Sequence, residues 1–139
     1  RNVLVSFNVS TNPDHRFRIA EACALAGFPN EILAVSEYRT QLSRSRFVIS
    51  PPGNGVDCHR TWEAFYHRTI PVIEKKSYLF SHIELPVLVY DDINEFLILT
   101  EDEMLEQYEK INSRFYPAIY CDWWIIRIFD KLNNLNCRA

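Results

Sequence analysis

The chain has 139 residues and a mass of 16.4 kDa, the size of one domain with its own hydrophobic core. Hydrophobic residues make up 47% and charged residues 24% of the sequence, which excludes disordered and collagen-like chains. Its 15 basic and 18 acidic residues give a net charge of −3, which leaves no basic field for a nucleic acid, and no apolar run approaches the roughly 18 residues of a transmembrane helix.

The N-terminal third predicts a strand followed by a helix. Residues 2–9 (NVLVSFNV) carry the apolar and β-branched residues typical of a strand. Residues 10–14 (STNPD) are of the types that favour a turn and a helix N-cap. Gly27 is expected to end the helix that follows them. We interpret residues 32–35 as a second, short strand and residues 36–45 as a polar helical or loop segment.

The rest of the chain continues this alternation. Residues 46–50 (RFVIS) predict a strand that leads directly into the loop Pro51-Pro52-Gly53-Asn54-Gly55, and Asp57 is expected to cap a helix over residues 58–67. Two further strands, a helix capped by Asp92 and two longer helices are predicted at residues 70–74, 85–90, 93–96, 101–115 and 121–132. The last helix is apolar almost all round, so we expect it to pack on the domain or on a missing partner half.

These elements predict an α/β fold. Continuous apolar strands that alternate with helices indicate a Rossmann-like, three-layer parallel sheet with helices on both faces. We find no repeat or linker, so residues 1–139 are expected to be a single domain, cut from a longer chain because neither an initiator Met nor a signal peptide opens it. Ligands of such sheets bind outside the carboxyl ends of the strands. Three of these ends carry polar residues, at 8–14, 50–57 and 91–92.

The loop after the strand at 46–50 is a candidate phosphate site. Gly53 and Gly55 predict unusual backbone there and a close approach to a ligand. The helix that follows offers free N–H groups and a positive partial charge, and Arg60 adds a bidentate cation. Glu63 lies about one turn further on the same face, where a carboxylate can accept hydrogen bonds from ribose hydroxyls. The alternative is a tight surface turn with an Arg60–Glu63 ion pair, because GxGxxG and GxxxxGK[ST] are both absent.

A second strand-to-helix junction carries cations where the helix dipole disfavours them. Arg16 and Arg18 lie near the start of the predicted helix, and this placement is explained if an anion docks there. A solvated helix face is the alternative, and without further support it is slightly favoured.

Metal and redox chemistry have little support. The four cysteines are far apart and form no CxxC pair: Cys23, Cys58, Cys121 and Cys137. We expect Cys23 in the core. His59, Glu63 and His67 follow one another at intervals of four residues on one helix face, but this spacing differs from HExxH. We interpret them as a solvated face and predict no metal site.

Two long stretches resemble a known family. SRFVISPPGNGVDCHRTWEAFYHRTIPVIEK and the later LPVLVYDDINEF resemble the exostosin-like glycosyltransferases of the family 47 type, whose pattern is F-x-x-x-P-x-G-x-G-x-D-x-x-R-x-W-E-A and then G-x-I-P-V-I. SFNVSTNPDHR, which ends in Arg16, is similar to the family's first strand and turn. The resemblance is densest over residues 45–97, weaker over 2–28 and absent from the last third. Arg68 stands where the family has glycine.

The resemblance implies the C-terminal, donor-binding half of an inverting GT-B glycosyltransferase. Its donor would be a UDP- or GDP-type nucleotide sugar, and its acceptor a glycan or another hydroxyl compound. By resemblance, the donor diphosphate is held by Arg16, Gly53, Asn54, Gly55 and Arg60, and the ribose or sugar by Asp57 and Glu63. No obligatory metal or cofactor is implied. The general base is expected outside this chain, in the missing N-terminal half.

Two other functions fit the same sequence. A nucleotide-binding or protein-interaction module that keeps the fold but transfers nothing is the main alternative. A phosphate-binding hydrolase or receiver domain fits the architecture, with Asp91 and Asp92 as its acidic pocket, but the Arg60 helix and the lack of a matching lysine at a strand end count against it. The compartment depends on the source: cytoplasmic for a bacterial or viral protein, the Golgi lumen for a eukaryotic secretory enzyme.

Overall fold

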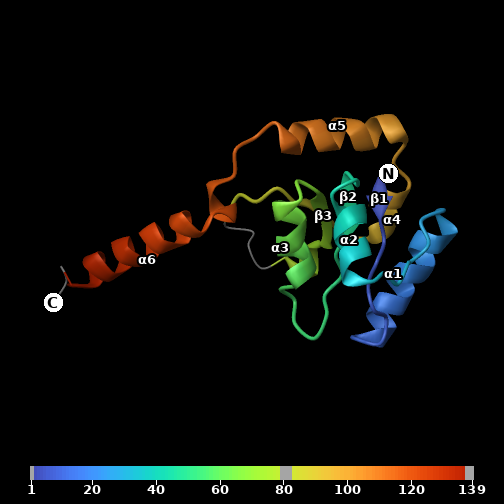
Figure 1. The fold of residues 1–139 in the computed structure, drawn as a ribbon, viewed down its shortest axis with the longest axis horizontal. Helices are drawn as coiled ribbons and strands as arrows, with labels where there is room; N and C mark the ends of the chain where they lie inside the picture. Colours follow the sequence, from blue (N-terminus) through green and yellow to red (C-terminus); the bar gives the residue numbers. More distant parts are fainter. Residues whose placement is uncertain (1, 79–82, 137–139) are drawn as a thin grey trace.

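The computed structural model describes residues 2–78 and 83–136 and is shown in Figure 1. Cys137 therefore lies outside the described residues. The elements in chain order are β1 (Val3–Leu4), α1 (Pro13–Leu25), α2 (Val35–Leu42), β2 (Phe47–Ile49), α3 (His59–Tyr66), β3 (Ile70–Glu74), η1 (Lys75–Ser77), β4 (Leu88–Tyr90), α4 (Ile93–Leu97), α5 (Glu101–Asn112), η2 (Pro117–Ile119) and α6 (Cys121–Asn136).

The four strands form one parallel sheet in the order β1-β2-β3-β4. Phe47 in β2 pairs with Val3 on one side and with Ile70 on the other, and Val72 in β3 pairs with Leu88 in β4. Helices α1, α4 and α5 supply side chains to the core on one face, and α2 and α3 supply them on the other. The predicted three-layer, Rossmann-like α/β fold is therefore confirmed.

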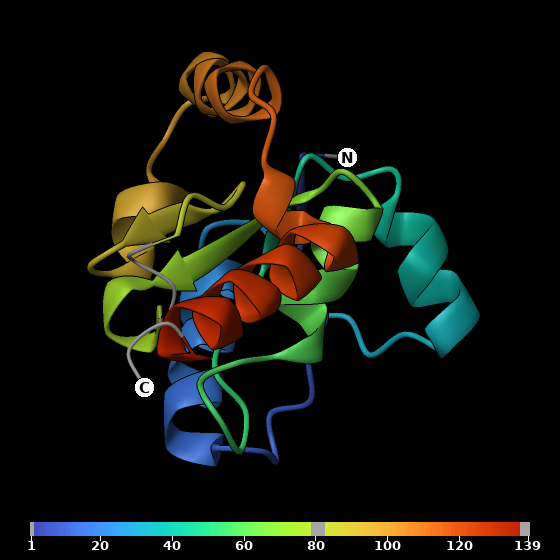
Figure 2. The same ribbon diagram turned by 90° about the vertical axis from the view of Figure 1, so that its left-hand side faces the viewer.

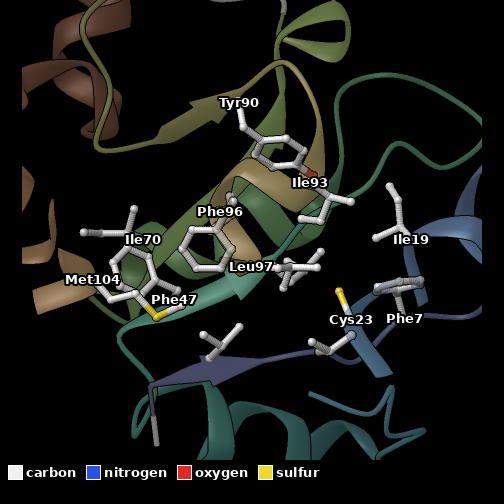
Figure 3. Packing of buried hydrophobic residues seen from close by; sticks show 14 residues of the cluster. Phe7, Ile19, Cys23, Phe47, Ile70, Tyr90, Ile93, Phe96, Leu97 and Met104 are labelled. Atoms are coloured by element: carbon white, nitrogen blue, oxygen red, sulfur yellow. The ribbon is translucent and has the colours of Figure 1, made fainter. Parts of the chain in front are cut away.

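The main core lies under α1, α4 and α5. Alternate strand residues point to this face because successive side chains of a strand face opposite ways. Phe47 packs edge-on against Phe96 with ring centroids 5.3 Å apart, and Met104 and Ile70 lie beside them (Figure 3). Cys23 is fully buried in the same cluster, as predicted, and burial raises the pKa of its thiol to about 12.

The first strand and its flanking segment differ from the prediction. Only Val3–Leu4 pair as a strand, because beyond them the backbone of Phe7 exchanges two hydrogen bonds with the side chain of Asn30, at 3.0 and 2.9 Å. The predicted strand at residues 32–35 is wrong. Ile32 is 76% and Val35 67% exposed, and Leu33 between them packs against the core, so the segment leads into α2 and pairs with no strand.

Two helices end in the same motif with different residues. After α1, Phe28 N–H bonds Cys23 O and Gly27 N–H bonds Ala24 O, with Gly27 at φ 86°, so Gly27 ends the helix as predicted. After α3, the N–H groups of Thr69 and Arg68 make the equivalent bonds to the carbonyls of Ala64 and Phe65. Arg68 has φ 57° there, a left-handed conformation that favours glycine.

Helix α6 extends away from the rest of the molecule (Figure 1). Its first turn is attached through Trp123, which packs against the cluster around Phe65, and through Trp124 Nε1, which donates to Ala118 O at 2.8 Å. Beyond this turn, five apolar residues are about half exposed or more: Ile125, Ile126, Ile128, Phe129 and Leu132. The expectation that α6 packs on the domain therefore holds only for its start. Among the described helices, none has the length and hydropathy needed to cross a membrane.

Replacing Arg68 by glycine is expected to stabilise the protein by about 1 kcal/mol. A left-handed residue with a Cβ costs roughly 1–2 kcal/mol, part of which the extra freedom of glycine in the unfolded chain cancels. Urea denaturation of wild type and Arg68→Gly measures the difference. Arg68→Ala is the control, because alanine keeps the Cβ and should give no such gain. Equal effects of the two substitutions would contradict the explanation.

Candidate functional site

The carboxyl ends of β1 and β2 open into one cleft of about 620 Å³. The loops after these strands and the start of α1 lie at one end of the sheet, opposite α5, in both Figure 1 and Figure 2. All seven residues predicted to bind the donor line this cleft: Arg16, Gly53, Asn54, Gly55, Asp57, Arg60 and Glu63. The third marked strand end does not line it. Asp92 instead accepts a hydrogen bond from Asn94 N–H at 2.9 Å and caps α4, as expected.

Arg16 is buried and holds the two cleft loops together. Its Nε donates to Pro52 O at 2.8 Å, one terminal nitrogen to Pro51 O at 3.2 Å, and the other to Asn8 O at 2.8 Å. Three backbone carbonyls, from the loops after β1 and after β2, therefore meet at one guanidinium. Such carbonyls have few other donors in a buried loop. Arg16, which was predicted to bind the ligand, therefore also holds the two loops of the site in position.

The glycines of the loop act differently from the prediction. Neither Gly53 nor Gly55 has a positive φ, so the loop needs no glycine for its backbone conformation. Gly53 is favoured by space, because a Cβ there would lie 3.1 Å from a terminal nitrogen of Arg16, which is closer than an ordinary contact. A Cβ on Gly55 would meet no atom within 4 Å. The N–H of Gly53 bonds Gly55 O at 3.0 Å and is therefore occupied within the loop.

Arg60 presents an unneutralised charge to the cleft. It lies in the first turn of α3, and its Nε is buried without a hydrogen-bond partner. Its guanidinium carbon lies 6.0 Å from the ring centroid of Phe7 and 5.7 Å from that of Tyr38. Within residues 2–78 and 83–136, no carboxylate forms an ion pair with Arg60. The Arg60–Glu63 ion pair that the sequence analysis gave as an alternative is therefore not present.

Arg16 and Arg60 share one neighbour and repel each other. Arg16 lies 5.7 Å from the centroid of the same Phe7 ring. Burial lowers the pKa of Arg16, and the nearby positive charge of Arg60 lowers it further. Like charges held together in a concave site favour an anion that neutralises both. The electrostatics of the cleft therefore suit a phosphate or another anionic group.

The two acidic residues of the cleft have different surroundings. Asp57 accepts a hydrogen bond from Trp62 Nε1 at 2.8 Å. The predicted N-cap role of Asp57 is wrong, because the cap of α3 is Cys58, one residue later, which makes no side-chain cap bond. Glu63 lies one turn beyond Arg60, is partly exposed and lines the cleft. Glu63 remains the acidic residue best placed to accept hydrogen bonds from a ligand.

Arg18 belongs to a separate buried cluster. Glu74, at the end of β3, is 2% exposed and is surrounded by His15, Arg18 and Lys76 at 2.7, 3.3 and 3.3 Å. His15 therefore lies between a carboxylate and a guanidinium, with its Nε2 2.7 Å from Glu74 and its Nδ1 3.4 Å from Arg18. Arg18 therefore has a carboxylate partner, and its position needs no docked anion.

The three residues considered as metal ligands, His59, Glu63 and His67, do not form a metal-binding group in the described part of the chain. Within the described part of the chain, no three His, Cys, Asp or Glu side chains are placed to hold an ion. The absence of an obligatory metal remains a prediction. Ser50, which follows β2, is buried and hydrogen-bonded to Thr61 at 2.9 Å, so it joins the loop to α3.

Sequence reasoning missed Phe7 and Tyr38 as parts of the site. Phe7 follows β1 and is 2% exposed, so its place at a strand end was the signal that could have revealed it. Tyr38 comes from α2, which enters the cleft wall only because residues 32–34 do not form the predicted strand. Nothing in its local sequence indicated this position.

Gly53→Ala is expected to destabilise the protein by about 1–2 kcal/mol. The new methyl group would contact Arg16, which three hydrogen bonds prevent from moving away. Thermal unfolding followed by circular dichroism measures the change. Gly55→Ala is the matched control and should stay within about 0.5 kcal/mol of wild type. A wild-type melting temperature for Gly53→Ala would show that Arg16 is not held in this way.

His15 is expected to make stability fall as the pH drops from about 7 to 5. Burial lowers the pKa of His15, and of its charged neighbours only Glu74 opposes the shift, whereas Lys76, Arg18 and Arg16 add to it. Protons therefore bind the unfolded chain more readily, starting near the ordinary histidine pKa of about 6.5. Urea denaturation across this range should show a shallower decline for His15→Gln, whereas His67→Gln should follow wild type. Parallel declines for His15→Gln and wild type would refute the role of His15.

Comparisons with known proteins identify no family for this chain. A scan against protein-family models finds no match. A search of curated proteins also finds no relative. The functional conclusion therefore rests on the cleft and on the resemblance in the sequence.

Proposed function

We propose that this chain is the donor-binding domain of an inverting glycosyltransferase, with the diphosphate of a UDP- or GDP-type nucleotide sugar in the cleft. The observation that carries the proposal is the pair of guanidiniums of Arg16 and Arg60 on one Phe7 ring, with no paired carboxylate among the described residues. The cleft lies at the carboxyl ends of parallel strands and at the start of a helix, where anions bind in such folds. The resemblance to the exostosin-like family supports the same ligand.

The proposal assigns these residues roles that differ from those predicted from the sequence. Arg60, which lines the cleft and forms no ion pair among the described residues, binds the diphosphate directly. Arg16 holds the loop Pro51–Gly53 in place through carbonyl bonds and adds positive charge from beneath. Asn54 and Gly55 border the same space, and Glu63 and Asp57 are left for the ribose or the sugar.

In the proposed reaction, the acceptor hydroxyl attacks the anomeric carbon from the face opposite the diphosphate. The bond between this carbon and the diphosphate oxygen breaks, and the nucleoside diphosphate leaves with one more negative charge. Arg60 and the first turn of α3 stabilise this charge, which is largest after bond cleavage. The acceptor proton passes to a base that we place outside this domain. No residue of this chain is assigned that role.

A non-catalytic module is the second candidate, and α6 favours it. Five apolar side chains of this helix are exposed beyond its first turn, and exposed apolar surface of this kind marks interaction sites. An interaction module with the same fold would not need a nucleotide in the cleft. Nucleotide binding therefore separates the two candidates.

Calorimetric titration with UDP, GDP and UMP tests the proposed function. We expect a diphosphate to bind more tightly than UMP, and the better of UDP and GDP identifies the base preference. Arg60→Ala should weaken diphosphate binding by roughly 10- to 100-fold, because it removes charge-assisted hydrogen bonds. Arg39→Ala, on the exposed side of α2, removes the same charge outside the cleft and should bind like wild type.

Two outcomes would contradict the proposal. A folded wild-type domain that binds none of the three nucleotides would favour the interaction module. Equal losses for Arg60→Ala and Arg39→Ala would show that net charge, and not the cleft, attracts the ligand.

A further inference from the structure

A second pocket, of about 240 Å³, lies at the amino ends of β3 and β4. This amino-end pocket is bordered by the end of α3, the start of β3, the end of α5 and the chain between α5 and α6. It lies at the end of the sheet where α5 lies, opposite the cleft that holds Arg16 and Arg60 (Figure 1). Ligands of parallel α/β sheets bind at the carboxyl ends of the strands, so neither the fold nor the resemblance assigns a ligand to this pocket.

Most side chains that line the amino-end pocket are aromatic or aliphatic, and they include Phe65, Ile70, Ile111, Phe115, Tyr116 and Tyr120. Phe115 and Tyr120 are 75% and 53% exposed and stack with their ring centroids 5.8 Å apart. Exposed aromatic surface at a pocket marks a binding site. The volume exceeds the roughly 150 Å³ of a cavity that holds benzene and falls below the roughly 300 Å³ at which sites for drug-sized ligands begin. A ligand body of one or two rings therefore fits.

Three polar side chains of this pocket are already engaged within the protein. The Thr69 and Tyr116 hydroxyls each donate to a backbone carbonyl, at 2.7 and 3.0 Å. Arg114 pairs with Glu84 at 2.9 Å. Arg68 also lines the pocket, but no carboxylate within residues 2–78 and 83–136 forms an ion pair with it. Among the described residues of the pocket, Arg68 is therefore the cation that is left for a ligand.

Arg68 occupies its position at a conformational cost. Its φ of 57° lies in the left-handed region, where a residue with a Cβ is disfavoured relative to glycine. The turn that ends α3 therefore does not explain an arginine at this position. Residues in strained conformations are concentrated at binding sites, where their side chains serve the function. A guanidinium at the wall of the amino-end pocket supplies such a function.

We propose that the amino-end pocket binds a small aromatic carboxylate, with its ring against Phe115 and Tyr120 and its carboxylate on Arg68. The guanidinium presents a planar set of donors that matches the two oxygens of a carboxylate. The single negative charge of this anion also balances the one cation of the pocket that has no carboxylate partner among the described residues. The inference goes beyond the proposed function and uses no residue of the cleft.

NMR titration of the isotope-labelled chain with cinnamate, an aromatic carboxylate, and with cinnamamide, its neutral counterpart, tests this inference. Cinnamate should cause saturable shifts of the amide signals of Arg68, Phe115 and Tyr120. Cinnamamide should bind about 3- to 10-fold more weakly, because it lacks the charge that the exposed guanidinium attracts.

Arg68→Gln should abolish the preference for cinnamate, because glutamine keeps the Cβ and removes the charge. Arg39→Gln, on the exposed side of α2, is the matched control. It removes the same charge outside the pocket and should keep the wild-type preference. An unchanged preference in Arg68→Gln would show that the carboxylate does not contact this residue and would overturn the inference.

Phe115→Ala tests the contact with the ring of the ligand. It should weaken the binding of cinnamate and cinnamamide by the same factor, roughly 2- to 10-fold, because the two compounds share the ring. Phe17→Ala is the matched control, since Phe17 is 62% exposed on α1 and does not line the pocket. Equal binding by Phe115→Ala and Phe17→Ala would contradict the stacking contact.

Three results with the wild-type protein would also overturn the inference. Binding of neither compound, or of both equally, would show that the pocket does not recognise an aromatic carboxylate. Signal shifts confined to the exposed apolar residues of α6 would show that the compound adsorbs to that helix. Displacement of cinnamate by UDP or pyrophosphate would place it in the cleft. Nucleotide binding by itself tests only the proposed function, so the failure of one conclusion is distinguishable from the failure of the other.

Discussion

The site depends on the burial of one guanidinium among backbone carbonyls. Arg16 is 6% exposed and bonds the carbonyls of Asn8, Pro51 and Pro52. Without this cation, the loops after β1 and β2 would meet as carbonyl against carbonyl and repel each other. Gly53 is subject to the same constraint, since a Cβ there would lie only 3.1 Å from a terminal nitrogen of the guanidinium. The shape of the cleft at these two loops is thus a consequence of burying the single charged side chain of Arg16.

A buried cation that bonds only neutral carbonyls leaves its charge unbalanced, and Arg60 stands close enough to feel it. The aromatic ring of Phe7 lies under both guanidiniums and offers the negative face of its π-system. This arrangement reduces the repulsion without cancelling the charge. An anionic ligand completes the balance, so the electrostatics that define the floor also define what binds above it.

The sequence predicted the fold well because its signals were local. Continuous apolar strands at residues 46–50 and 70–74, the cap at Asp92 and the stop at Gly27 each follow from nearest neighbours. The segment 32–35 failed because its β-branched residues look like a strand, while Asn30 already fills the edge position beside Phe7. That contact is made by a side chain 23 residues away, which no local pattern reports.

The sequence predicted which residues line the cleft better than it predicted what each of them does there. All seven residues meet in the cleft because they flank the ends of neighbouring parallel strands, which pattern alone indicates. The roles needed three-dimensional information. That Arg16 is engaged by carbonyls, that Arg18 belongs to Glu74, and that Asp57 bonds Trp62 all depend on partners distant in sequence or on side-chain direction.

The cleft has one firmly held wall and one lightly held wall. Helix α1 is fixed at its start by Arg16 on the cleft side and by His15 and Arg18 on Glu74, so this wall has little freedom to shift. The opposite wall is the start of α2, with the exposed Ile32 before it and the exposed Val35 as its first residue, and Leu42 is the buried residue of this helix. Adjustment of the cleft to ligands of different size therefore falls to α2. Such an arrangement keeps the charged floor preorganised while the apolar rim adapts, so that the entropic cost of binding is confined to one short helix.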